Sequence, residues 1–340
     1  MSPDQLLQLQ DITALNIEVS SKCIGKCPFC SRQQKVRPYG GHLISFSEFK
    51  LLPADFIRQL EWITFAGNFG DFCSNPEFVE IAGYVKKLNP SVKMGGDTNG
   101  SLRDASWWKD LGPFFHDGGI VFSLDGLADT HAIHRRGTNF HKIIKNIEAF
   151  TAAGGTAYWK FIAFKHNEHQ IKAAETLAED IGCARFFVIS SRDYDERCRR
   201  PETFDFKIKR EIFSAYRQKH PSNEAPVRCK PWHNGSIYIA ADGSVHPCCF
   251  AHCMYITQHN RLFQFIVPLI EQNICQINFK TRPLAEIVSG PYFSAVRSES
   301  KLNRYCATKC SPFKKQIRKE LILHDTYFQN KLTIGAGSTT

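Results

Sequence analysis

The sequence lacks the features that mark exported and membrane proteins. Its first residues, MSPDQLLQLQD, contain no basic segment followed by an apolar one, so they do not resemble a secretory signal. The longest strongly apolar stretch, residues 263–270, is too short to cross a bilayer and contains a proline. We therefore expect a cytoplasmic protein that has no membrane partner.

Neither disorder nor an extreme charge pattern is present. Hydrophobic residues make up 43% of the 340 residues and charged residues 22%, which is typical of a folded globular protein. The net charge of +10 is compatible with binding to nucleic acid, but Lys and Arg cluster only modestly, at 197–200 and 314–319. A generally basic surface is the simpler interpretation, and RNA remains an alternative partner.

Cysteine, in contrast, is abundant. In a reducing compartment the thirteen cysteines are not expected to form structural disulfides, and an odd number cannot pair completely. Three lie within residues 23–30, and seven lie between residue 229 and residue 310. This distribution predicts two separate metal-binding regions.

Alternating strand and helix patterns predict the fold. Apolar, β-rich runs alternate with segments of helical spacing over residues 13–200, after an N-terminal extension at 1–12. Because parallel neighbours need crossover connections, we expect an α/β fold, a partial (β/α)6 TIM-like barrel with its chemistry at the C-terminal strand ends. The predicted strands are 13–20, 62–67, 91–98, 119–124, 157–164 and 184–190, and the predicted helices are 46–60, 76–88, 104–112, 140–150 and 169–182.

After residue 200 the pattern becomes irregular. We expect a linker at 201–224, a small cysteine-rich domain at 225–315, and a C-terminal helix and tail at 316–340. Within the small domain, the Asp-Gly pair in 236-SIYIAADGSV-245 predicts a turn between two short strands of its own.

Three cysteines, Cys23, Cys27 and Cys30, directly follow the first predicted strand in the spacing C-x3-C-x2-C. Three thiols are one short of a closed tetrahedral site. The spacing alone is compatible with zinc completed by a distant ligand, with free thiols, or with an iron–sulfur cluster that has one open iron.

The stretch 19-VSSKCIGKCPFCSRQQ-34, with Phe29 before its last cysteine, resembles the signature of the radical S-adenosylmethionine (SAM) superfamily. The resemblance implies a [4Fe–4S] cluster on Cys23, Cys27 and Cys30, whose open iron is chelated by the amino and carboxylate groups of SAM. It also implies reductive cleavage of SAM to a 5′-deoxyadenosyl radical, which abstracts a hydrogen atom from substrate. The electron would come from a donor such as flavodoxin or ferredoxin.

Later strand ends extend the resemblance in the expected order. The segment 67-GNFGDFCSNPEF-78 resembles the family's "GGE" segment, with Asp71 one methylene shorter than the usual Glu. Next come 97-DTNGS-101, similar to a T-N-G element, and then 123-SLDG-126. The resemblance implies that SAM is contacted by Phe29, Gly70, Asp71, Thr98, Asn99, Ser123, Asp125 and Arg135.

Chemical roles follow for some of these positions. Glycine at Gly70 lets the backbone approach a ligand closely, and the Asp71 carboxylate is expected to accept hydrogen bonds from the SAM ammonium group. Ser123 is expected to contact the SAM ribose or carboxylate. Arg135 is expected to bind the SAM carboxylate, because a guanidinium can bond it in a bidentate way.

The second cysteine region, 229-CKPWHNGSIYIAADGSVHPCC-249 with 304-RYCATKC-310, resembles the SPASM auxiliary-cluster domain. It lacks the intermediate C-x2-C-x5-C arrangement of the two-cluster form. The resemblance therefore implies one auxiliary [4Fe–4S] cluster, and a zinc ion on the same four thiolates is the alternative. The implied ligands are Cys229, Cys248, Cys306 and Cys310. Residues 284–297 resemble the helix that precedes the closing cysteines in that family, so a helix is predicted there.

Three further cysteines lie in this region. We interpret Cys249, Cys253 and Cys275 as free buried thiols, with an alternative ligand role that could involve His252.

The implied function is that of a radical SAM enzyme that modifies a peptide, a protein or a small molecule. RNA modification is the alternative substrate class. A non-catalytic zinc or iron–sulfur binding module is the alternative of a different kind. No residue is assigned as general acid or base.

Overall fold

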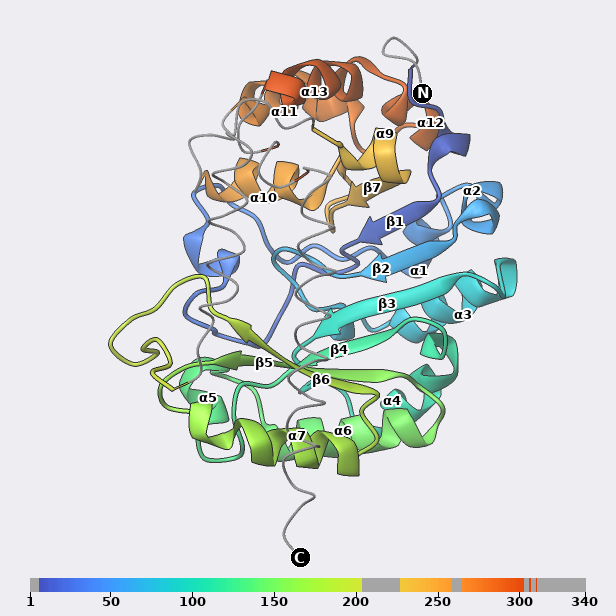
Figure 1. Cartoon of the computed structure of the whole chain (residues 1–340). Coiled ribbons are helices and arrows are strands. Elements are labelled where there is room, and N and C mark those ends of the chain that lie inside the picture. Colours follow the sequence, from blue (N-terminus) through green and yellow to red (C-terminus); the bar gives the residue numbers. More distant parts are fainter. Residues whose placement is uncertain (1–5, 204–226, 259–264, 303–305, 307–309, 311–340) are drawn as a thin grey trace, which may run out of the picture.

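The computed structural model describes residues 6–203, 227–258, 265–302, 306 and 310 (Figure 1). Its centre is a sheet in which all six predicted strands are present and each lies parallel to the next. The α/β class and the partial barrel are therefore confirmed. The strands are β1 (Ala14–Ile17), β2 (Trp62–Phe65), β3 (Lys93–Thr98), β4 (Gly119–Ser123), β5 (Ala157–Ala163) and β6 (Arg185–Ser190).

Helices follow the strands and cover the outer side of the sheet (Figure 1). Asp104 and Asn139 cap α4 and α6 by accepting a hydrogen bond from the backbone N–H three residues on. The predicted helix 46–60 is wrong in one respect, because Pro53 divides it into α1 and α2. The helices here are α1 (Phe46–Phe49), α2 (Ala54–Gln59), α3 (Phe78–Leu88), α4 (Ala105–Leu111), α5 (His131–His134), α6 (Phe140–Ala152) and α7 (Ile171–Asp180).

The cysteine-rich region extends the same sheet. Strand β7 (Ser236–Ile239) pairs parallel with β1, and β8 (Val245–His246) pairs antiparallel with β7 across a turn in which Gly243 has φ +96°. The predicted hairpin is confirmed, but the expectation that its strands belong only to the small domain is wrong. An open barrel leaves one edge of β1 unpaired, and β7 satisfies the hydrogen bonds of that edge.

The remaining helices pack beyond β7, away from the barrel helices (Figure 1). The predicted helix 284–297 is two helices, because the first ends at Val288 and the second begins at Pro291. The predicted C-terminal helix and most of the linker lie outside the described residues. These helices are α9 (Lys230–Asn234), α10 (Cys249–Thr257), α11 (Ile266–Asn273), α12 (Leu284–Val288) and α13 (Pro291–Leu302).

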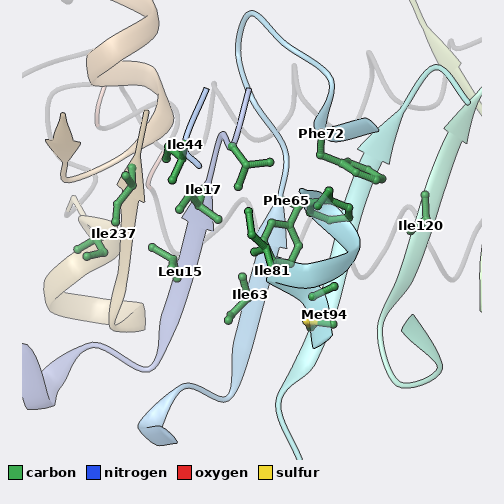
Figure 2. Close-up of a cluster of buried hydrophobic side chains, with 14 of the residues drawn as sticks. Leu15, Ile17, Ile44, Ile63, Phe65, Phe72, Ile81, Met94, Ile120 and Ile237 are labelled. Carbon is green, nitrogen blue, oxygen red and sulfur yellow. The ribbon is translucent and has the colours of Figure 1, made fainter. Parts of the chain in front are cut away.

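A continuous apolar core holds the two parts of the sheet together. Figure 2 shows Leu15 and Ile17 of β1 beside side chains of β2 and β3, with Ile81 of α3 packed against them. Ile237 of β7 belongs to the same cluster, so the added strand shares the barrel's core. No helix in the described part of the chain is long and apolar enough to span a membrane.

Candidate functional site

The first cysteine set, Cys23, Cys27 and Cys30, lies in the loop after β1. The loop curls tightly around Gly25, since a Cβ added there would lie 3.4 Å from Cys23 Sγ and 3.7 Å from Cys27 Sγ. Arg32 fixes the turn by donating from Nη1 to the carbonyls of Cys23 (2.9 Å) and Gly25 (3.0 Å). The cysteines are therefore held in one tight, partly exposed loop.

The surroundings of Cys23 and Cys27 favour the protonated form of each thiol. Burial raises the pKa of Cys23 to about 11, and the negative charge of Asp71 adds to the rise. Burial also raises the pKa of Cys27. A metal that binds here must displace the thiol protons.

Asp71 is the centre of a buried hydrogen-bond network, the Asp71–Asn99 network, which joins the loops after β2 and β3. Its carboxylate accepts hydrogen bonds from Thr98 Oγ1 (2.9 Å), from the backbone N–H of Asn99 (2.7 Å) and of Cys73 (3.1 Å), and from Asn99 Nδ2 (2.5 Å). Its oxygens are thus engaged within the chain, and the same amide nitrogen of Asn99 lies 3.6 Å from Cys23 Sγ. The structure shows Asp71 positioning Asn99 beside the first cysteine set.

Gly70 stands where no side chain fits. A Cβ there would lie 1.7 Å from the backbone oxygen of Ser20, so the loop after β2 passes directly against the end of β1. The predicted need for glycine at this position has a steric cause within the chain itself.

A second buried polar group lies at the end of β4. Asp125 Oδ2 accepts from Arg135 Nε (2.5 Å) and is 2.6 Å from His134 Nδ1, while Oδ1 accepts from the backbone N–H of Ile162 (2.7 Å). Although burial acts in the opposite direction, Arg135 and then His134 hold the pKa of Asp125 well below its usual range. Arg135 also hydrogen-bonds to Cys27, so this ion pair borders the first cysteine set.

Two other predicted residues lie at the same end of the barrel. The ring of Phe29 stacks on His134 with centroids 5.9 Å apart and lies 6.4 Å from the ring of Phe164. Ser123 is buried as the last residue of β4. The fold thus brings Phe29 and Ser123 to the C-terminal ends of the strands, where the other predicted residues also lie.

The second cysteine set, Cys229, Cys248, Cys306 and Cys310, lines a single pocket. Cys229 and Cys248 are the N-cap residues that directly precede α9 and α10. Burial, and next the proximity of Cys248, raises the pKa of Cys229 well above its usual value. The rest of the wall is mostly apolar and consists of Lys230, Pro247, Phe250, Ala251, Phe265, Val296 and Ser300.

The three remaining cysteines of this region do not line the pocket. Cys253 is buried and hydrogen-bonds to Ser31, Cys249 is half-buried, and Cys275 is exposed, so the expectation of a buried thiol is wrong for Cys275. His252 is buried, and neither of its ring nitrogens has a hydrogen-bond partner among the described residues.

Two family models match the chain. The radical SAM superfamily model matches residues 17–179, and that of the SPASM iron–sulfur cluster-binding domain matches residues 229–311. This chain belongs to the radical SAM superfamily. Its C-terminal part is a SPASM domain, and radical SAM proteins with this domain are enzymes that use a [4Fe–4S] cluster, SAM and auxiliary iron–sulfur clusters.

Solved radical SAM structures share the fold. SuiB from Streptococcus suis bound to SAM is 16% identical, with a TM-score of 0.56 over 84% of this chain and 68% of that chain. SuiB bound to its precursor peptide SuiA is 14% identical, with a TM-score of 0.56 over 87% and 70%. The protein anSMEcpe with bound SAM is 15% identical, with a TM-score of 0.52 over 92% and 99%. No curated protein sequence matches the chain.

The donor chemistry of both cysteine sets fits the radical SAM assignment. Thiolates are the usual ligands of iron–sulfur clusters, and four of them close the second set while three leave the first set open. In the described part of the chain, no His, Cys, Asp or Glu side chains are grouped closely enough to hold a single metal ion. The fit therefore rests on the gathering of cysteines in one loop and around one pocket.

Sequence motifs did not identify one residue at this edge of the sheet. Glu18, directly after β1, is buried and hydrogen-bonded to the loop that carries Gly70. The only local signal was a charged residue within an otherwise apolar run.

Proposed function

We propose that this radical SAM protein cleaves SAM reductively at the first cysteine set and modifies a peptide, a protein or a small molecule. The observation that carries the proposal is that three groups lie side by side at one edge of the sheet. They are the first cysteine set, the Arg135–Asp125 ion pair and the Asp71–Asn99 network. When bound, the cluster supplies the electron that cleaves SAM and thereby starts hydrogen-atom abstraction from the substrate.

Arg135 is our candidate for binding the SAM carboxylate. Asp125 accepts from its Nε and Cys27 is a second hydrogen-bond partner, so the guanidinium is fixed beside the first cysteine set, where its planar shape suits a planar anion. Phe29 packs against His134, the other partner of Asp125. The residues Gly70, Thr98, Asn99 and Ser123 are proposed to complete the SAM site.

Asp71 receives a different role from the one its sequence position suggests. Its carboxylate oxygens already accept hydrogen bonds from Thr98, Asn99 and Cys73. We therefore propose that Asp71 positions the Asn99 amide beside Cys23 instead of receiving the SAM ammonium group itself.

The second cysteine set is proposed to hold one auxiliary [4Fe–4S] cluster. Four thiolates leave no iron open to substrate, which favours electron transfer or shaping of the substrate pocket. A peptide or protein substrate is supported by fold similarity to SuiB, whose structure contains its precursor peptide. The electron donor is proposed to be a small redox protein such as flavodoxin or ferredoxin.

The test is anaerobic incubation of the reconstituted protein with SAM and dithionite, followed by detection of 5′-deoxyadenosine. We expect 5′-deoxyadenosine from the wild-type protein and from Cys275→Ala, a control that removes an exposed thiol outside both sets. Cys27→Ala is expected to produce none.

Two results would contradict the proposal. One is equal formation of 5′-deoxyadenosine by the wild-type protein and Cys27→Ala. The other is a purified protein that contains zinc but no iron or sulfide, which would support a non-catalytic zinc module.

A further inference from the structure

Glu18 is buried where the loop after β2 and the SPASM domain meet. It follows β1 directly, and only 2% of its surface is exposed. Its Oε1 accepts from the backbone N–H groups of Phe69 (2.8 Å) and Gly70 (2.7 Å). Its Oε2 accepts from the hydroxyl groups of Tyr238 (2.9 Å) and Tyr39 (3.5 Å). One carboxylate thus joins the barrel to β7.

The loop held by Oε1 leads to the first cysteine set. Gly70 is followed by Asp71, whose carboxylate fixes Asn99, and the amide of Asn99 lies 3.6 Å from Cys23 Sγ. A shift of the loop at Gly70 would therefore move a group that borders a cluster ligand.

The Tyr238 hydroxyl, which donates to Oε2, connects Glu18 with the region of the second cysteine set. Tyr238 belongs to β7, and its hydroxyl also accepts from Asn68 Nδ2 (3.2 Å). The same amide of Asn68 donates to the backbone oxygen of Cys249 (2.9 Å), which directly follows the pocket residue Cys248. Glu18 and Asn68 thus bind the Tyr238 hydroxyl from the barrel side.

The loop after β2 packs closely against Glu18 and Ser20. A Cβ on Gly67 would lie 2.2 Å from Glu18 Oε1, and a Cβ on Gly70 would lie 1.7 Å from the oxygen of Ser20. Close packing on both sides of the carboxylate means that a change at Glu18 is passed on to the loop.

We infer that Glu18 and Tyr238 are positioning residues of the radical SAM site. They fix the position of the loop after β2 relative to the SPASM domain. The inference rests on the proposed function of the first cysteine set as the SAM-cluster site. Neither residue is a cluster ligand, so both clusters are expected to assemble without them. What is lost is the alignment of the loop, and with it SAM affinity and the rate of cleavage.

Two substitutions separate the contacts of the carboxylate. Glu18→Gln keeps an acceptor for the Phe69 and Gly70 amides but replaces the acceptor for Tyr238 by an NH₂ group. Tyr238→Phe removes only the hydroxyl. Tyr158→Phe, in β5, is the matched control because its side chain is not part of this network.

The primary measurement is hydrogen–deuterium exchange at Phe69 and Gly70 in the reconstituted protein without SAM, together with iron content. We expect Glu18→Ala to speed exchange at these amides roughly tenfold, because it removes the acceptor of both. Glu18→Gln and Tyr238→Phe are expected to give smaller increases, Tyr158→Phe none, and all variants to keep their iron. The three site variants should bind SAM more weakly, as measured by calorimetry.

Unchanged exchange at both amides in Glu18→Gln and Tyr238→Phe, with unchanged SAM affinity, would overturn the inference even if Glu18→Ala fails to fold. The proposed function fails separately, through absence of 5′-deoxyadenosine from the wild-type protein. In that event the exchange data still decide whether Glu18 fixes the loop.

Discussion

The first cysteine set lies among buried charged and amide groups, whereas the second cysteine set surrounds a pocket with mostly apolar walls. Beside the first set lie the Asp125–Arg135 ion pair, whose carboxylate is fully buried, and the Asp71–Asn99 network. We call these two groups the polar shell. In the wall of the second, Ser300 is the hydroxyl that hydrogen-bonds to Cys229.

This difference matches what each site is proposed to bind. SAM brings an ammonium group, a carboxylate and a sulfonium charge, and fixed dipoles and charges are needed to replace the water around them. A cluster with four protein ligands needs no further polar partner, so apolar walls suffice to enclose it. The polar shell around the first set is therefore the part of the site that depends on an exact arrangement of hydrogen bonds.

The largest effect is expected when the polar shell is broken at its most buried charge. Asp125→Asn leaves Arg135 buried without its counter-ion, and such losses typically cost about 3–5 kcal/mol of unfolding free energy. SAM binding should be lost as well. Urea denaturation of both proteins measures the cost, and a loss below about 1 kcal/mol would show that Asp125 does not organise this shell.

Acid sensitivity offers a check on the same residue. Because the folded pKa of Asp125 is depressed, its contribution to stability is present above the pKa of the unfolded chain and is lost as the pH falls through the folded value. The Asp125→Asn variant should therefore lose less stability on acidification than the wild-type protein.

An intermediate effect is expected from the pH dependence of Glu18. Burial is the main cause that raises its pKa from 4.5 to about 7, and the ionisable groups that face it are Tyr39, Tyr238 and Asp242. The folded protein holds this proton more tightly, so its contribution to stability is full below pH 4.5 and is lost as the pH rises through about 7.

The measurement is the difference in unfolding free energy between Glu18→Gln and the wild-type protein, followed from pH 4.5 to pH 8. The difference should change in favour of the variant by roughly 3 kcal/mol across that range. Buried histidines such as His246 and His252, whose pKa values burial lowers to about 3, contribute equally to both proteins and cancel. A constant difference would contradict the assignment.

The smallest effect is expected in the wall of the second set. Ser300→Ala removes one hydrogen bond to Cys229 in a mostly apolar pocket, so stability should change by about 0.5–1 kcal/mol. Iron content and formation of 5′-deoxyadenosine should stay at wild-type levels. A loss of iron as large as that caused by a cysteine substitution would mean that polar groups matter equally at both sites.

The sequence predicted much of this arrangement, and its limits have physical causes. Six strands, the hairpin at 236–245 and both cysteine sets follow from local periodicity and spacing, which depend on neighbouring residues. The parallel pairing of β7 with β1 joins residues more than two hundred positions apart, and no local pattern encodes it. The roles of Asp71 and Glu18 escaped for the same reason, since their partners lie on other loops.

The most direct test of the contrast between an open and a closed cluster site is electron paramagnetic resonance of the reduced, reconstituted protein before and after addition of SAM. We predict that SAM changes the spectrum of the wild-type protein and of Cys248→Ser, which lacks a ligand of the second set. The spectrum of Cys27→Ala should not respond to SAM. An equal response to SAM in Cys27→Ala, with none in Cys248→Ser, would contradict the account, because SAM would then bind at the second set.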